Sequence, residues 1–251
     1  MLGNKKVVCI IPARLQSTRF PRKMLINLKG KPLLQWVWEA ATKVAIFDEV
    51  AFAVDAQETA TLIEAFGGRY YMTSQSCMSG TDRLVELSTS GRVSSDIWVN
   101  WQGDEPFVTG QMIHDLLHTA HRDKSDLWTL KKRIVNTEDA LNPHISKVVT
   151  NDKGFALYFS RSAIPYYRDP CPDKHKVFFK HVGIYAYSER ALLRIRRMQP
   201  SYLEEAEQLE QLRFLYHRLK IRVHETEQEV FGIDLPEHVV KAEAYLEALI
   251  S

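Results

Sequence analysis

Short apolar runs alternate with amphipathic stretches along most of the sequence, and this alternation limits the possible folds more than any other feature. Residues 7–11 (Val-Val-Cys-Ile-Ile) are apolar throughout, and further strand-like runs follow at 50–54, 69–72 and 97–101. Near-continuous apolar strands suit a parallel sheet that is covered on both faces. The pattern therefore predicts an α/β fold with a mostly parallel, Rossmann-like sheet flanked by helices. The helices of this part are expected at residues 33–44, 57–66 and 81–88.

The second half of the sequence mixes strand and helix patterns, which indicates a smaller α+β part. Leu209, Leu212 and Tyr216 recur at steps of three or four, and this spacing predicts a single helix over residues 203–216. A closing helix is expected at residues 237–249. The strands are expected at residues 127–134, 145–149, 155–159, 182–187 and 221–225.

The composition excludes several classes of protein. A net charge of +2 on 251 residues is too small to indicate nucleic acid or an anionic membrane as the main partner. The three cysteines are scattered and odd in number, which indicates neither a disulfide framework nor a metal site. No apolar run approaches the roughly 18 residues that span a bilayer. We therefore expect a cytoplasmic protein.

The loop after the first predicted strand is rich in cations and hydroxyls. No acidic residue precedes Glu39, whereas the same stretch contains eight Lys and Arg residues. In open α/β sheets, ligands collect at the carboxyl ends of the strands. Guanidinium, ammonium and hydroxyl groups are suitable partners for a triphosphate, although a solvated basic loop has the same composition. The loop residues concerned are Arg14, Ser17, Thr18, Arg19, Arg22 and Lys23.

Two aspartates follow predicted strands or precede a predicted helix, where they could ligate a metal ion. Asp104 follows the apolar run at 97–101, and Asp234 stands just before Pro236 and the closing helix. Mg²⁺ takes oxygen ligands and often uses one or two carboxylates together with substrate phosphates. Asp104 as a turn residue and Asp234 as a helix cap are the alternative interpretations.

Ordered motifs along the whole chain resemble those of the 3-deoxy-manno-octulosonate cytidylyltransferases, the CMP-Kdo synthetases. The opening Ile-Ile-Pro-Ala-Arg (10–14) is shared with other nucleotidyltransferases of the same fold, so it indicates the class more than the substrate. The segments Tyr-Phe-Ser-Arg (158–161) and His-Val-Gly-Ile-Tyr (181–185) are more particular to this family. Further matches are Ser-Gly-Thr-Asp-Arg (79–83), Gln-Gly-Asp-Glu-Pro (102–106) and Leu-Glu-Gln-Leu-Arg (209–213).

This resemblance implies a role for each candidate residue. The first half, residues 1–125, would mainly bind CTP, and residues 126–251 would mainly bind the sugar acid and form a homodimer interface. Arg14, Lys23 and Asp104 would be catalytic, and Asp104 with Asp234 would bind Mg²⁺. The nucleotide would contact Arg14, Ser17, Arg19, Lys23, Ser79, Thr81, Arg83 and Gln102. The sugar acid would contact Gln102, Arg161, His181, Tyr185, Glu210 and Gln211.

The implied reaction transfers CMP from CTP to 3-deoxy-D-manno-octulosonate (Kdo), releasing pyrophosphate and giving CMP-Kdo for lipopolysaccharide biosynthesis. Two alternatives stay open at this point. One is a cytidylyltransferase for another acidic acceptor, such as 8-amino-Kdo, a sialic-type acid or a phosphonate. The other is a catalytically weakened binding or regulatory paralogue. The second follows from Arg22, which replaces a glycine of the family's phosphate loop. We expect Arg22 to add a cation to the triphosphate site, at a position that does not need a positive φ.

Overall fold

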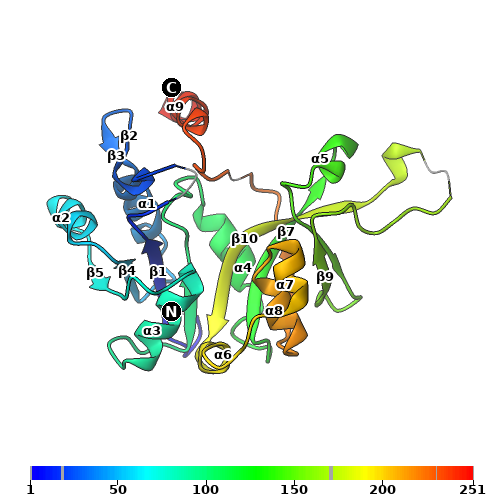
Figure 1. Cartoon of the computed structure of the whole chain (residues 1–251), viewed down its shortest axis with the longest axis horizontal. Coiled ribbons are helices and arrows are strands. Elements are labelled where there is room, and N and C mark those ends of the chain that lie inside the picture. Colours follow the sequence, from blue (N-terminus) through cyan, green and yellow to red (C-terminus); the bar gives the residue numbers. More distant parts are fainter. Residues whose placement is uncertain (1, 18–19, 170–171, 230, 251) are drawn as a thin grey trace. The chain divides into compact units, whose positions relative to one another are not determined.

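The computed structural model describes residues 2–17, 20–169, 172–229 and 231–250, and it divides into two compact units. The first unit comprises Met1–Ile113 together with Glu229–Ser251, and the second comprises His114–Gln228. Both combine a sheet with helices, as Figure 1 shows, and the predicted α/β class is confirmed. Within the described residues, no helix is both long enough and apolar enough to cross a membrane.

A parallel four-stranded sheet forms the centre of the first unit. Strand β1 (Val7–Ala13) is buried along its whole length and pairs in parallel with β4 (Glu49–Val54) and β6 (Ile97–Asn100). Strand β5 (Tyr70–Met72) extends the sheet beyond β4, so the spatial order is β5-β4-β1-β6. The chain therefore reverses its direction of sheet growth at β1, and ligands bind at such reversal points in open α/β sheets.

Helix α3 (Gly80–Thr89) begins at a capping residue that the sequence provides. Ser79 caps α3 through a capping box, in which its hydroxyl accepts from the Asp82 amide and the Asp82 carboxylate accepts from the Ser79 amide. The predicted helices are found within two residues of their expected ends. The elements are the 3₁₀ turn η1 (Lys23–Leu25), β2 (Asn27–Leu28), β3 (Lys31–Pro32), α1 (Leu33–Thr42), α2 (Gln57–Ala65), α3 (Gly80–Thr89) and α4 (Gly110–Leu117), which was not predicted.

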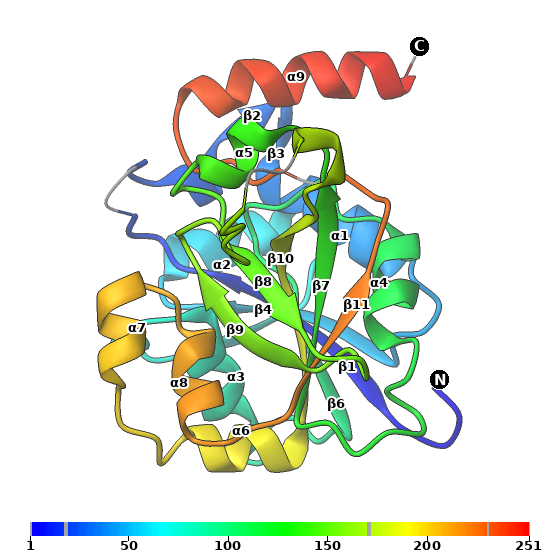
Figure 2. The same cartoon turned by 90° about the vertical axis from the view of Figure 1, so that its right-hand side faces the viewer.

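The segment after residue 228 returns to the first unit and packs on it. Helix α9 (Glu237–Ile250) lies beside β2, as Figures 1 and 2 show from two sides. Its apolar side joins a core that contains Leu28, Phe107 and Ile233. The rings of Phe107 and Phe231 are 4.7 Å apart between centroids, within the range of favourable aromatic pairs. Burial of these side chains fixes the backbone that carries Asp234.

The strands of the second unit pair in both directions. Strand β7 (Leu127–Ile134) pairs in parallel with β11 (Ile221–Glu225) and antiparallel with β10 (Phe178–Ser188). A register shift between Val182 and Tyr185 interrupts the β10–β7 ladder. The remaining elements are α5 (Thr137–Leu141), β8 (Lys147–Thr150), β9 (Ala156–Ser160), the 3₁₀ turn η2 (Asp173–His175), α6 (Glu189–Ile195), α7 (Tyr202–Glu207) and α8 (Gln211–Tyr216).

The prediction of one helix over residues 203–216 is wrong, because the segment contains two. Helix α7 ends at Gln208, which adopts a left-handed conformation with φ +52°. The Arg213 guanidinium then donates to the Glu204 carboxylate at 2.8 Å and 2.5 Å, which links the two short helices. Leu209 and Leu212 are both buried, as the apolar spacing predicts. The spacing did not indicate that the helix is interrupted at Gln208.

Candidate active site

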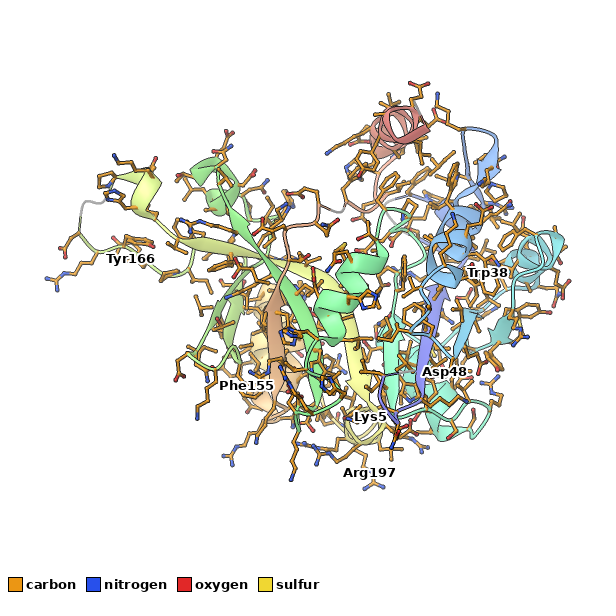
Figure 3. All side chains as sticks on the ribbon, turned by 180° about the vertical axis from the view of Figure 1, so that it is seen from behind. Lys5, Trp38, Asp48, Phe155, Tyr166 and Arg197 are labelled. Atoms are coloured by element: carbon orange, nitrogen blue, oxygen red, sulfur yellow. The ribbon has the colours of Figure 1, made fainter. Side chains whose placement is uncertain are left out.

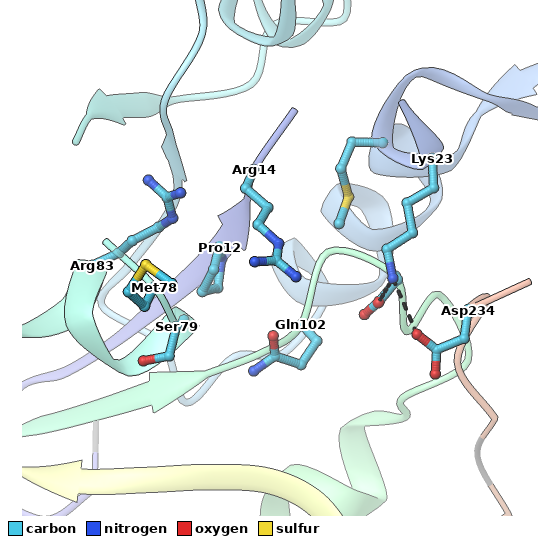
Figure 4. Close-up of a pocket in the computed structure, with 11 residues that line it drawn as sticks. Pro12, Arg14, Lys23, Met78, Ser79, Arg83, Gln102 and Asp234 are labelled. Atoms are coloured by element: carbon cyan, nitrogen blue, oxygen red, sulfur yellow. Dashed lines mark hydrogen bonds and ion pairs between the residues drawn. The ribbon is translucent and has the colours of Figure 1, made fainter. Parts of the chain in front are cut away.

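A cavity of about 180 Å³ opens at the carboxyl ends of β1 and β6 in the first unit. It contains three cationic and two anionic side chains. Figure 4 shows Arg14 and Gln102 extending toward the same space from opposite walls, with Lys23 and Asp234 at one end. The lining residues are Pro12, Arg14, Lys23, Met24, Met78, Ser79, Gly80, Arg83, Gln102, Asp104 and Asp234. Seven of the residues predicted from the sequence thus meet at one place.

A glycine allows the loop after β6 to lie against the end of β1. The Gly103 amide donates to the Pro12 carbonyl at 3.2 Å. A Cβ at Gly103 would stand 2.8 Å from that carbonyl oxygen, closer than a side chain tolerates. The neighbouring residues Gln102 and Asp104 are therefore held beside Arg14, which follows β1 directly. The spacing Gln-Gly-Asp brings two polar groups to the cavity because the residue between them can make this close approach.

Lys23 lies between the two predicted metal ligands. Its ammonium contacts the Asp104 carboxylate and donates to the Asp234 carboxylate at 3.2 Å. The lysine is 7% exposed, so both ion pairs are partly shielded from water. Asp234 reaches this position because the Ile233 amide donates to the Asp104 carbonyl at 2.9 Å. Two carboxylates far apart in the sequence thus share one positive charge.

A third carboxyl group, that of Glu105, lies near these carboxylates and is mostly protonated at neutral pH. Burial, followed by the nearby Asp104 and Asp234 carboxylates, raises the pKa of Glu105 to about 8, while Lys23 acts in the opposite direction. The carboxylate oxygens of Asp104 and Asp234 are the kind of donor that Mg²⁺ prefers. Among the described residues, no cluster of three or more His, Cys, Asp or Glu side chains is arranged to hold an ion. An ion here would need phosphate oxygens to complete its coordination.

The phosphate-loop residues differ in how well they match the prediction. Arg14 is exposed and lines the cavity, while the Ser17 hydroxyl accepts from the Phe20 amide at 3.4 Å and does not line it. Arg19 lies outside the described residues. The expectation for Arg22 is wrong in its backbone: Arg22 has φ +58° and ψ +24°. Its guanidinium contacts the Glu58 carboxylate rather than the cavity.

Helix α3 presents its N-terminus to the cavity. Ser79, its capping residue, lines the wall, and the first amides of a ten-residue helix favour anions. Arg83 is 2% exposed and donates to the Asp55 carboxylate at 2.7 Å and to the Thr73 hydroxyl at 2.6 Å. Thr81 is 2% exposed and does not line the cavity. Arg83 therefore supports the wall, with part of its surface exposed to the cavity.

A second cavity of about 330 Å³ adjoins the first, because Arg14, Met78 and Arg83 line both. The sequence did not single out its other polar wall residues, Gln16 and Gln75. Asp55 connects the walls, since one of its oxygens accepts from the Leu15 amide at 2.9 Å and the other from Arg83. Asp55 directly follows β4, the strand next to β1, and this position at the carboxyl end of a strand could have indicated that it lies near the site.

Four of the residues predicted to bind the sugar acid lie close together in the second unit. His181 and Tyr185 stand on β10, and their ring centroids are 5.3 Å apart. Burial, followed by the nearby Tyr187 and Glu210, raises the pKa of Tyr185 well above its ordinary value, so its hydroxyl keeps its proton. Glu210 caps α8, and the adjacent Gln211 is 5% exposed.

Arg161, the fifth predicted residue of this unit, uses much of its guanidinium to hold backbone. Its Nε donates to the Glu207 carbonyl at 2.6 Å, and its two terminal nitrogens donate to the carbonyls of Pro143 (3.0 Å) and Gln208 (3.3 Å). Three of the five N–H groups of an arginine are thus engaged. The Arg161 carbonyl in turn accepts from the buried Lys147 ammonium at 2.5 Å. Among the residues that the structure describes, no partner is found for the other two N–H groups of Arg161.

Residues 8–221 match the family model described as Cytidylyltransferase. Together with a parallel sheet that carries a cation-lined cavity at its reversal point, this match defines the class of the protein. The chain is a cytidylyltransferase, a type of nucleotidyltransferase.

Comparison with individual proteins narrows the class. A 3-deoxy-manno-octulosonate cytidylyltransferase of Geotalea daltonii is 46% identical over 240 residues, which cover 92% of this chain and 94% of that protein. One of Thermodesulfovibrio yellowstonii is 44% identical, over 95% and 97% respectively. A solved structure of CMP:2-keto-3-deoxy-manno-octonic acid synthetase complexed with CTP has a TM-score of 0.90 and 39% identity, over 97% of this chain and 99% of that one. The chain belongs to the 3-deoxy-manno-octulosonate cytidylyltransferase family, as its motifs predicted.

Proposed function

We propose that this protein transfers CMP from CTP to 3-deoxy-D-manno-octulosonate, with release of pyrophosphate, and so supplies CMP-Kdo for lipopolysaccharide biosynthesis. The observation that supports this most directly is the arrangement of Lys23 between Asp104 and Asp234, at the end of a cavity that also contains Arg14. Cations and carboxylates side by side suit a substrate that brings both a triphosphate and a divalent ion. Membership of the family supports the identity of both substrates.

The two adjoining cavities of the first unit divide the nucleotide between them in this proposal. The triphosphate would lie in the smaller one, where Arg14 and Lys23 provide charge and Ser79 presents the amides of a helix N-terminus. The cytidine would lie in the larger one, where Gln16 and Gln75 provide amide groups that can both donate and accept. Arg14 would contact the nucleotide at the junction of the two, and Gln102 would face the acceptor.

Asp104 and Asp234 fit Mg²⁺ by the chemistry of their donors, and we propose that they hold it when CTP is bound. The ion would neutralise charge on phosphate oxygens and favour ionisation of the attacking hydroxyl. Lys23, which contacts both carboxylates, would keep their oxygens oriented and supply a further positive charge to the triphosphate. Lys23 and Asp104 already form a partly buried ion pair, so these two side chains do not have to be brought together when CTP binds.

The reaction forms a bond between the anomeric oxygen of the sugar acid and the α-phosphorus of CTP. The bond from that phosphorus to the bridging oxygen of the β-phosphate breaks, and pyrophosphate leaves with the electron pair. The hydroxyl proton passes to solvent water. Arg14 and Lys23 would stabilise the charge that develops on the phosphate oxygens.

We propose that groups of the second unit bind the sugar acid. The two N–H groups that Arg161 retains suit a carboxylate, which pairs with a guanidinium through two parallel bonds. The protonated Tyr185 hydroxyl, Glu210 and Gln211 would bind sugar hydroxyls. His181 lies beside Tyr185 and would contribute a ring nitrogen.

We further propose that the enzyme is a cytoplasmic homodimer. Three large apolar side chains of the second unit are strongly exposed: Val135 (94%), Tyr166 (85%) and Leu141 (69%). Figure 3 shows Tyr166 at the edge of the unit, extending away from its own sheet. Surface apolar side chains of this size favour a protein interface. Tyr166→Ser and Leu141→Ser together should shift the protein from dimer to monomer in sedimentation equilibrium.

Pyrophosphate release with each nucleotide and a panel of acceptors tests the function. CTP with Kdo should give the highest kcat/KM, and omission of Mg²⁺ should abolish turnover. UTP, ATP and GTP are matched controls for the base, while 8-amino-Kdo and a sialic acid are controls for the acceptor. A higher kcat/KM with another acceptor would replace Kdo in the proposal, and the absence of turnover with every pair would overturn it.

A further inference from the structure

A buried hydroxyl next to His181 has more hydrogen-bond partners than it has protons. Thr129 on β7 is fully buried, and its Oγ1 lies 2.9 Å from Nε2 of His181. The same oxygen lies 2.8 Å from the Ile184 carbonyl and 3.2 Å from the Val182 carbonyl. The two carbonyls belong to the stretch of β10 where the register with β7 shifts, so they point at the threonine rather than along a regular ladder.

The Thr129 hydroxyl has a single proton, and this limits which of its contacts it can donate to. A threonine hydroxyl donates one hydrogen bond and accepts up to two, whereas a carbonyl oxygen only accepts. If the Thr129 proton went to His181, Oγ1 would lie 2.8 Å from the Ile184 carbonyl oxygen with no proton between the two oxygens, which is repulsive. If it goes to the Ile184 carbonyl, Nε2 of His181 can donate to Oγ1, and the two shorter of the three contacts each have a proton. The second arrangement therefore holds, and His181 bears a proton on Nε2.

The rest of the His181 environment keeps the ring neutral and fixed. Burial lowers the pKa of His181 to about 3, so at neutral pH the ring has a single N–H. The rings of Phe159 and Tyr185 pack at 4.9 Å and 5.3 Å from it, which restricts its rotation. With the proton on Nε2, the lone pair is on Nδ1, and Nδ1 has no hydrogen-bond partner among the described residues.

We propose that Thr129 is a positioning residue that fixes His181 as the Nε2–H tautomer, so that Nδ1 offers a hydrogen-bond acceptor to a hydroxyl of the sugar acid. This inference rests on the proposed function for its substrate and adds the chemistry of the contact. An acceptor nitrogen repels a carboxylate and selects a group that carries a proton. His181 therefore accepts a hydrogen bond from a hydroxyl of the sugar acid, and other residues bind the carboxylate of the sugar acid.

Two variants separate positioning from packing. Thr129→Val keeps the size and the β-branch of the side chain but removes the hydroxyl, and Thr129→Ser keeps the hydroxyl. Long-range ¹H–¹⁵N correlation spectra of protein with ¹⁵N-labelled histidines report the tautomer of each ring, and the signal of His181 is assigned as the one absent from His181→Asn. The wild type and Thr129→Ser should show Nε2–H, whereas Thr129→Val should show a mixture or Nδ1–H.

Steady-state kinetics on the same proteins test the contact with the substrate. Thr129→Val should raise the KM for Kdo about tenfold, the factor for one lost hydrogen bond of about 1.4 kcal/mol, and leave the KM for CTP within twofold. Thr129→Ser should restore the KM for Kdo. An Nδ1–H signal in the wild type would overturn the inference, as would a Thr129→Val protein whose Kdo and CTP KM values rise together. The spectra need no substrate, so an Nε2–H wild type without Kdo turnover would refute the proposed function and leave the tautomer assignment standing.

Discussion

The left-handed backbone of Arg22 makes a prediction whose sign can be measured. A residue with a Cβ loses roughly 1–2 kcal/mol in this conformation, whereas glycine adopts it freely. Glycine also loses about 0.5–1 kcal/mol more backbone entropy on folding. Arg22→Gly and Arg22→Ala both remove the exposed ion pair with Glu58, so their difference isolates the backbone. Arg22→Gly should therefore be more stable than Arg22→Ala by about 0.5–1 kcal/mol.

Urea unfolding followed by tryptophan fluorescence measures this difference, which corresponds to about 1–4 °C in the thermal midpoint of a chain this long. Glu58→Gln is the control, because it removes the ion pair and leaves the backbone of residue 22 unchanged. If φ at this position were negative, Arg22→Ala would be the more stable variant. An Arg22→Gly protein less stable than Arg22→Ala would therefore refute the reasoning. CTP affinity should be nearly equal in wild type and Arg22→Gly, and a loss that shrinks at high salt would instead restore a phosphate role for the guanidinium.

Three further changes test the sites directly. Asp104→Asn and Asp234→Asn should each lower kcat about a hundredfold or more, since lost charge stabilisation in a transition state amounts to roughly 3–4 kcal/mol; near-normal activity with the usual Mg²⁺ requirement would remove that residue from the proposed metal site. Arg161→Ala should raise the KM for Kdo at least tenfold more than that for CTP and also lower the thermal midpoint, because three carbonyls lose a donor; an equal rise for both substrates would contradict the assignment. The free energy of unfolding should fall as pH decreases from about 6.5 toward 3, because His181 takes up a proton in the unfolded state but not in the folded state. His181 contributes at most about 1.4 kcal/mol per pH unit to this fall. Urea unfolding measures it, and an equally steep pH dependence in His181→Asn would show that other groups cause it.

Local patterns predicted the parts of this fold that local physics determines. The buried strand β1 and the strand β6 are readable from runs of apolar residues, and the carboxyl ends of parallel strands meet at one edge. That rule suffices to bring Arg14 near Asp104. The parallel sheet, the helices α1, α2 and α3, and the first-unit cavity were accordingly predictable within a few residues.

The remaining features depend on contacts between distant segments. Nothing near Gln208 signals a left-handed residue, because glycine is the usual marker and glutamine is not, so the helix break went unpredicted. Arg22 is the same case in the phosphate loop. The role of the Thr129 hydroxyl could not be predicted from the sequence, since its hydrogen-bond partners lie more than fifty residues away on β10. Such features arise from tertiary packing, which periodicity does not encode.

The return of residues 229–251 to the first unit has a consequence for how activity appears during synthesis. Asp234 is held by the Ile233 contact to Asp104 and by the burial of α9 against β2. Ile233, Asp234 and α9 leave the ribosome after the other cavity residues. A nascent or prematurely released polypeptide would contain Arg14, Lys23 and Asp104 but only one of the two carboxylates. The two carboxylates can therefore meet at Lys23 only after residues 229–251 have been synthesised and have packed on the first unit. Proteolysis between Gly232 and Asp234 would likewise separate the second carboxylate from the chain that carries Arg14, Lys23 and Asp104.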